Sequence, residues 1–243
     1  MPYLILSLVI QLALVVHIVK TGRNMTWIFV VLFFPLVGTL AYVIVELLPE
    51  WNGSRTGVTM RRKLAKLANP DRGFRHASEK FAVADTVQNT IALAKECLAK
   101  ERHAEAAELY QRAMRGVHED DPVLLYGLAR AKFGMGDAAG TVAALDLLKE
   151  RHPEHTSPEG HLLYARAREA LGETGAALIE YEALVGYYPG PEPACRLAAI
   201  LKRQGRNAEA QALFQKVLNE SRIAGRHYNS IHREWVEIAR REA

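Results

Sequence analysis

The chain has 243 residues, of which 49% are hydrophobic and 24% charged, and its formal net charge at pH 7 is +4. This composition is too apolar for a disordered chain, and two cysteines are too few for a disulfide-rich scaffold. The positive charge is concentrated in residues 51–79, with seven basic and two acidic groups, whereas residues 80–243 carry 22 basic and 23 acidic groups. Because the larger part is nearly neutral, we expect no nucleic-acid partner.

Two apolar runs, Met1–Val19 and Met25–Val45, begin the chain, and neither contains Lys, Arg, Asp or Glu. A membrane span needs roughly 20 apolar residues in a helix. The first run lacks the basic start and the small-residue cleavage site of a signal peptide, so an uncleaved anchor is favoured over a leader. Because only residues 20–24 connect the runs, the sequence predicts an antiparallel two-helix transmembrane anchor over residues 1–48.

The distribution of basic residues around these runs predicts their orientation. Two basic residues, Lys20 and Arg23, lie in the connection, and five follow the second run within residues 51–66. Positive charge favours the cytoplasmic side. We therefore expect a two-span protein of a bacterial inner (plasma) membrane with its C-terminal domain in the cytoplasm; a periplasmic domain is the alternative.

The second run also carries a family resemblance. Trp27, Pro35-Leu36-Val37-Gly38 and Tyr42 follow a basic connection. This pattern resembles the N-terminal two-helix domain of cardiolipin synthases of the phospholipase D superfamily. The resemblance implies an anchor and no reaction, because the H-x-K motif of those enzymes is absent from the chain.

A basic segment follows, which we interpret as a linker over residues 49–78. Met60, Leu64 and Leu67 recur at helical spacing within it. That pattern suits a short helix on an anionic lipid surface, and an ordinary solvated linker is an equally good interpretation. The candidate membrane-surface residues are Arg61, Arg62, Lys63 and Lys66.

From residue 79 onward the chain repeats itself with a helical period. Four alanines, each preceded by a larger residue, are 35, 36 and 33 positions apart. A small residue follows each of them after twelve positions, and a glycine follows three of them after seven, with Glu101 in the first unit. Such a pattern predicts helix–turn–helix units that bury their apolar faces by stacking. The small residues are Ala94, Ala129, Ala165 and Ala198, then Ala106, Thr141, Ala177 and Ala210.

This repeat resembles the tetratricopeptide repeat (TPR) family across residues 87–222, as four units. Individual units are degenerate, since the large aromatic residue early in the first helix is missing. Beyond them Tyr228, Ile231, Trp235 and Ile238 recur at helical spacing, which predicts a capping helix. The predicted fold is therefore all-α, with a transmembrane helical hairpin followed by a TPR-like α-solenoid over residues 79–243.

No motif predicts catalysis, a metal or a cofactor. His152, His155 and His161 cluster between two units without the H-E-x-x-H order of a zinc site. Cys97 and Cys195 occupy helical positions where a small buried thiol fits. We therefore expect a chain that is not an enzyme and has neither a metal nor a cofactor.

The resemblance implies a concave surface lined by the first helix of each pair. Aligned units place Lys95, Arg130 and Arg166 at equivalent positions, with Tyr126 and Phe133 on the face of Arg130. A basic row with aromatic neighbours suits an acidic peptide. Solvated side chains without a ligand are the alternative, because surfaces are commonly about a quarter charged. Lys202 and Arg203 end the row.

These observations predict a membrane-anchored, non-enzymatic scaffold that binds a protein or acidic peptide at the cytoplasmic face of the inner membrane. Anionic lipid is the expected partner of the juxtamembrane segment. The alternative function is an accessory or regulatory factor for cardiolipin metabolism that acts through the hairpin.

Overall fold

The computed structural model describes residues 2–21, 26–34, 37–42, 69 and 71–243, and these contain helices and turns without a strand. The chain divides into two compact units, Met1–Arg72 and Gly73–Ala243. The predicted boundary at residue 79 falls inside helix α6 (Arg72–Val83). Most of the predicted linker, including its four candidate membrane-surface residues, lies outside the described residues.

The first unit contains α1 (Pro2–Lys20), α2 (Thr26–Phe33) and α3 (Val37–Tyr42). Its small core joins Ile18 to residues of α2 and α3, and the ring centroids of Trp27 and Tyr42 are 5.5 Å apart. A side chain at Gly38 would place its Cβ 2.1 Å from the Val30 carbonyl oxygen. Glycine thus permits a close backbone approach there; Pro35 lies outside the described residues.

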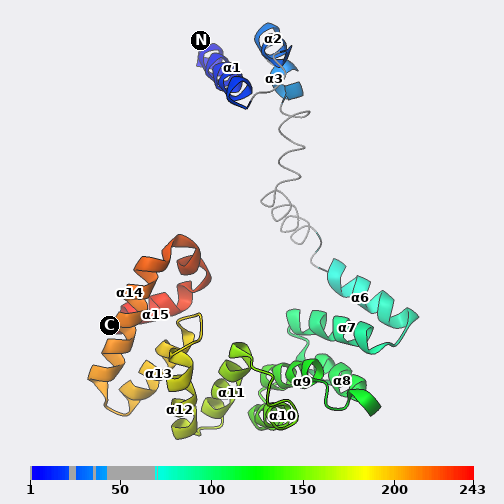
Figure 1. Ribbon diagram of the computed structural model, residues 1–243, viewed down its shortest axis with the longest axis vertical. Coiled ribbons are helices and arrows are strands. Elements are labelled where there is room, and N and C mark those ends of the chain that lie inside the picture. The colour runs from blue at the N-terminus through cyan, green and yellow to red at the C-terminus, as the bar shows by residue number, and fades with distance from the viewer. Residues whose placement is uncertain (1, 22–25, 35–36, 43–68, 70) are drawn as a thin grey trace. The chain divides into compact units, whose positions relative to one another are not determined.

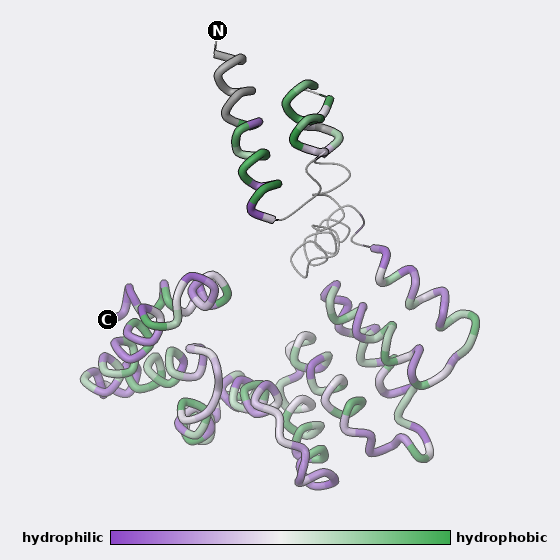
Figure 2. Tube along the Cα trace, turned by 45° about the horizontal axis from the view of Figure 1, so that its top comes forward, coloured by the Kyte–Doolittle hydropathy of each residue, from purple (hydrophilic) through white to green (hydrophobic). Residues whose placement is uncertain are grey.

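The described part of this unit contains no helix that is both long and apolar enough to span a membrane. The predicted localisation in an inner membrane is therefore wrong, and the predicted transmembrane hairpin is unsupported. One physical reason is that, within its described residues, the second apolar run forms helices of 8 and 6 residues, well short of the roughly 20 that a span requires. Figure 2 shows the hydrophobic colour of most of α2 and of most of the coloured part of α1.

The second unit is a succession of antiparallel helix pairs that follow a curve, with α7, α9, α11 and α13 toward its inner side (Figure 1). Contacts run mainly between each helix and the next, as expected for a stack of repeats. After α6, the helices are α7 (Val87–Ala99), α8 (His103–Ala113), α9 (Pro122–Gly134), α10 (Ala138–Arg151), α11 (Pro158–Ala170), α12 (Thr174–Val185), α13 (Glu192–Arg203), α14 (Asn207–Ile231) and α15 (Arg233–Glu242), with a 3₁₀ turn at Gly116–His118.

The turn within each pair uses a left-handed residue at the position that the repeat predicted. Gly136, Gly172 and Gly205 have φ values of 80°, 78° and 81°, and Glu101 takes the same role with φ 58°. Glycine adopts this conformation without strain, whereas a residue with a Cβ does not. The first turn therefore keeps the backbone geometry of the others at an energetic cost.

Small residues allow the two helices of a pair to pack closely, as the spacing predicted. The alanines at positions 94, 129, 165 and 198 are all fully buried. Thr141, which replaces alanine in the second pair, is also fully buried, and its hydroxyl donates to the Asp137 carbonyl oxygen at 2.7 Å. This backbone bond satisfies the hydroxyl, so threonine is tolerated at the crossing.

Helices at both ends cover the stack. At the start, α6 packs Phe74, Ala77 and Phe81 against the core of the first pair. At the end, Trp235 and Ile238 of α15 pack against the core of the last pair. The single capping helix that we predicted is in fact divided: Tyr228 and Ile231 belong to α14, whose backbone breaks at Gly225 with φ 81°, and Ile231 is 62% exposed.

Candidate partner-binding groove

Lys95 on α7 and Arg130 on α9 are both exposed. Each follows the buried alanine of its helix, so the two occupy equivalent positions of neighbouring pairs. Within the described residues neither forms an ion pair. Two uncompensated positive charges are therefore available to an anionic group on this part of the inner face.

Aromatic side chains accompany these cations. The Arg130 guanidinium carbon lies 6.0 Å from the centroid of the Tyr126 ring on the same helix. One turn further along α9, the ring of Phe133 has the Arg166 guanidinium carbon at 4.8 Å. These cation–π contacts restrict the long arginine side chains and so lower the entropy that a ligand must remove.

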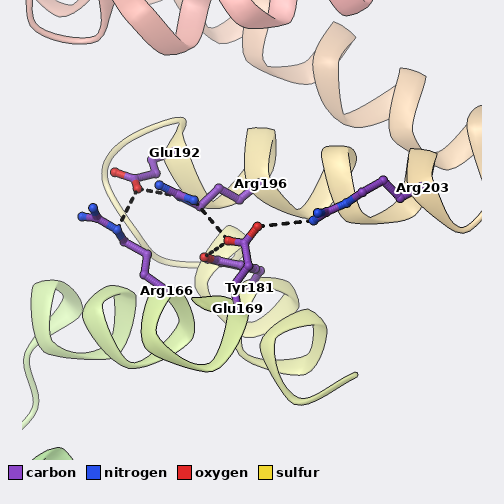
Figure 3. A network of polar contacts seen from close by, with 6 residues as sticks. All are labelled: Arg166, Glu169, Tyr181, Glu192, Arg196 and Arg203. Atoms are coloured by element: carbon purple, nitrogen blue, oxygen red, sulfur yellow. Dashed lines mark hydrogen bonds and ion pairs between the residues drawn. The ribbon is translucent and has the colours of Figure 1, made fainter. Parts of the chain in front are cut away.

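Arg166 belongs to a network of polar side chains that joins α11, α12 and α13 (Figure 3). Its Nε lies 3.6 Å from Glu192 Oε1, and Arg196 Nε donates to the same oxygen at 2.7 Å. The Arg166 Nε is buried without a hydrogen bond. Arg166 is thus attracted to Glu192 through charge, while its Nε–H has no hydrogen-bond acceptor among the described residues.

Glu169 is the second acidic centre of this network. Its carboxylate accepts from Tyr181 at 2.8 Å and from Arg196 at 3.1 Å, and Arg203 donates to its other oxygen at 3.3 Å. Burial and the bond to Glu169 raise the pKa of the Tyr181 hydroxyl above its ordinary value. The network therefore connects α11, α12 and α13 by hydrogen bonds and includes Tyr181 in its neutral form.

The structure thus separates the predicted basic row into residues with and without an ion-pair partner. Lys95 and Arg130 are free of ion pairs in the described part of the chain, whereas Arg166 and Arg203 face glutamates. Lys202 turns to another partner, since its Nζ lies 2.6 Å from Glu242 of α15. The half of the inner face formed by α7 and α9 is therefore the part with uncompensated positive charge.

Glu169, Glu192, Arg196 and Trp235 were not predicted as members of this surface. Glu192 and Arg196 are four residues apart on one helix, a spacing that indicates an ion pair from sequence. The Arg196 guanidinium also lies 5.1 Å from the Trp235 ring centroid. Glu169 and Arg196 are 27 positions apart, so only the stacking of pairs brings them together.

The described residues offer no group of three or more potential ligands to a metal. His152 contacts the Asp120 carbonyl oxygen at 2.5 Å, and His161 Nε2 lies 2.5 Å from Glu180 Oε2. Both cysteines are buried and free, as predicted. Burial raises the pKa of the Cys97 thiol to about 11 and that of Cys195 to about 12, which keeps both thiols protonated and poorly nucleophilic at neutral pH.

This geometry defines an α-solenoid of paired helices. A family model for the tetratricopeptide repeat matches residues 124–155, which cover most of α9, all of α10 and the first residues of the loop that follows. The resemblance to TPR proteins is thereby confirmed, and the fold is that of a TPR-like solenoid. The resemblance of the N-terminal region to cardiolipin synthases is not supported.

Solved structures share the fold at low identity. The crystal structure of MamA has 17% identity and a TM-score of 0.54, with 65% of this chain and 92% of that chain covered. A thermophilic TPR protein in Thermus thermophilus has 16% identity and a TM-score of 0.51, with coverage of 76% and 94%. No curated protein matches the chain. A TPR-like fold is generally a scaffold for protein interaction.

Proposed function

We propose that this chain is a non-enzymatic scaffold whose inner face binds an acidic, extended peptide segment of a partner protein across α7 and α9. One observation carries the proposal: Lys95 and Arg130 are exposed at equivalent positions and have no ion-pair partner in the described part of the chain. Their spacing by one helix pair suits a ligand that runs along the inner face. Carboxylates of that ligand would take the place of the missing partners.

The aromatic side chains beside these cations supply the apolar part of the proposed contact. Tyr126 and Phe133 are partly buried and lie on the same helix as Arg130. Partly buried rings provide contact area with little loss of conformational entropy. Arg166 is a secondary contact, because Glu192 already compensates its charge. Acidic residues with an apolar residue between them are therefore the preferred ligand sequence.

The test uses two fluorescently labelled twelve-residue peptides that differ only in charge, one with alternating Glu and Leu and the other with alternating Gln and Leu. Fluorescence anisotropy with the full chain should show binding of the Glu peptide that weakens as salt is added. Arg130→Glu should reduce its affinity at least about tenfold, since it replaces an attraction by a repulsion. Far-UV circular dichroism should show unchanged helicity.

The matched control is Arg115→Glu, which makes the same charge change at an exposed position between α8 and the 3₁₀ turn. It should leave the affinity within about twofold, because distant exposed charges are screened. Equal affinity of the two peptides, or equal losses in the two variants, would reject the groove as the binding surface.

A further inference from the structure

A pocket of about 290 Å³ lies between the second and third helix pairs, and it shares no residue with the groove. Residues of α10, α11 and α12 and of the loops after α10 and α12 line it. The side chains that matter for its chemistry are Asp146, His161, Tyr164, Glu180 and Tyr187. The volume is near the lower limit of ligand pockets, about 300 Å³.

The pocket exists because the third helix pair has a polar residue, His161, at the position where the second pair has a buried leucine. Leu125 precedes the buried alanine of α9 by four positions and is itself only 1% exposed. His161 occupies the equivalent position of α11 and is only partly buried. A ring that keeps its polar atoms near solvent leaves space between the pairs that leucine would close.

Hydrogen bonds fix one wall of the pocket. His161 Nε2 lies 2.5 Å from Glu180 Oε2, and His161 Nδ1 contacts the Tyr187 hydroxyl. The His161 and Tyr187 rings are also stacked, with centroids 5.9 Å apart and planes at 28°. Three side chains from α11, α12 and the following loop therefore hold one another in place, so the wall is arranged before any ligand arrives.

Hydrogen bonds also hold a second part of the pocket lining. Arg168 Nη2 donates to the Tyr164 hydroxyl at 2.5 Å, and its Nη1 donates to Glu173 at 2.5 Å. The Asp146 carboxylate lies next to the same hydroxyl and has no ion-pair partner in the described part of the chain. An acidic group without an ion-pair partner among the described residues thus stands beside the Tyr164 hydroxyl, while the Arg168 guanidinium carbon lies over the Tyr164 ring, 4.9 Å from its centroid.

From this arrangement we infer that the pocket binds a basic side chain, Arg or Lys, presented by a peptide. Two carboxylates, Asp146 and Glu180, and two phenol rings line the pocket together with Lys149 and two histidines. His161 is already bonded to Glu180, so Asp146 is the carboxylate left for a ligand. Carboxylates attract a guanidinium or ammonium group, and aromatic faces stabilise it further. The groove selects negative charge and this pocket selects positive charge, so they are independent sites.

Titration of the full chain with N-acetyl-arginine N-methylamide tests the assignment, with the citrulline analogue as a neutral probe of nearly equal shape. The ring carbon-bound proton signals of His161 and His155, identified through His→Gln variants, report binding by NMR. The arginine probe should shift both signals to saturation, and the citrulline probe should not. Asp146→Asn should weaken arginine binding by about fivefold, the effect of one exposed ion pair.

Two controls keep the result specific. Glu182→Gln removes an exposed carboxylate from the same helix as Glu180 and should leave binding unchanged, as should Arg130→Glu in the groove. Equal shifts with citrulline, stronger binding of N-acetyl-aspartate N-methylamide, or no shift with arginine would each overturn the assignment. Tighter binding of free putrescine than of the blocked arginine probe would overturn a peptide side chain as the ligand.

Discussion

The ring of Tyr110 on α8 packs directly on the backbone of Gly127 on α9. A Cβ built at Gly127 would lie 2.3 Å from the Tyr110 Cε1 atom, and Tyr110 is only 1% exposed. The contact joins the first helix pair to the second. It depends on the absence of a side chain at position 127, because a buried ring cannot move away without disturbing its own neighbours.

Gly127→Ala should therefore destabilise the solenoid by about 2 kcal/mol through overpacking. Urea unfolding followed by circular dichroism would measure the loss. Gly175→Ala is the matched control, because Gly175 is also helical and has no atom within 4 Å of the position that a Cβ would take. The control should be neutral or gain up to about 1 kcal/mol through helix propensity, and equal losses in the two variants would disprove the role of Tyr110.

Glu101 should gain stability on replacement by glycine. Its φ of 58° is left-handed, as at the three equivalent glycines. Glu101→Gly removes the strain of a Cβ in this conformation and should raise the unfolding free energy by up to about 1 kcal/mol. Gly136→Ala places the same strain in the second turn, where φ is 80°, and should lower stability by about 1 kcal/mol. Changes of the same sign in the two urea titrations would contradict this interpretation.

The sequence predicted the parts of the solenoid that depend on local spacing. The alanine positions and the left-handed turn residues recur at a nearly constant interval, so even Glu101 was placed correctly at a turn. The repeat constrains these positions because two helices of a pair can approach only through small side chains. Local pattern therefore determines the pairs.

Other features depend on contacts that no local pattern contains. Lys202 pairs with Glu242 across 40 residues, and Arg203 pairs with Glu169 across 34. Helical spacing shows which side of a helix carries a charge, whereas the neighbouring helices decide whether that charge is compensated. The prediction therefore treated all the cations of the basic row as equally available, although Arg166, Lys202 and Arg203 have acidic partners. The contact residues proposed for the groove remain a prediction.

The compensation of Arg166 by Glu192 leads to a test of the groove. Glu192→Gln keeps the shape of the side chain but removes its charge, which frees the Arg166 charge for a ligand. Affinity for the Glu-containing peptide should rise about twofold to fivefold, the worth of a partly exposed ion pair. Fluorescence anisotropy at low salt would show the increase.

Its control is Glu209→Gln, which breaks the exposed pair between Glu209 and Arg206 at the start of α14. This ion pair is also formed by an arginine and a glutamate, but neither residue is part of the groove. The control should leave peptide affinity unchanged. If both variants bind the peptide equally, the freed charge of Arg166 does not contribute to the groove.

The buried thiols should make stability fall in mildly alkaline solution. Burial, with a smaller contribution from Glu192, raises the pKa of Cys195 from 9.0 to about 12, and burial raises that of Cys97 to about 11. At pH 7 the thiols are protonated in both folded and unfolded chains. Above pH 9 the unfolded chain loses these protons while the folded chain retains them, so unfolding becomes more favourable as pH rises.

Between pH 9 and 10 the loss should be about 1 kcal/mol for each thiol. Urea unfolding of the unmodified chain and of Cys195→Ala at pH 7, 9 and 10 would measure it. The variant loses buried volume at every pH, so its stability at pH 7 serves as its own reference. Between pH 7 and pH 10 the unfolding free energy of Cys195→Ala should fall less than that of the unmodified chain. The difference between the two falls should equal the contribution of one thiol. Tyrosines with raised pKa values, such as Tyr181, add to the fall as the pH approaches 10, because a tyrosine in the unfolded chain ionises near that pH. They do so equally in both chains, so the difference between the two chains reports the thiol. Parallel pH profiles for the two chains would mean that Cys195 is not protected from ionisation by the folded core.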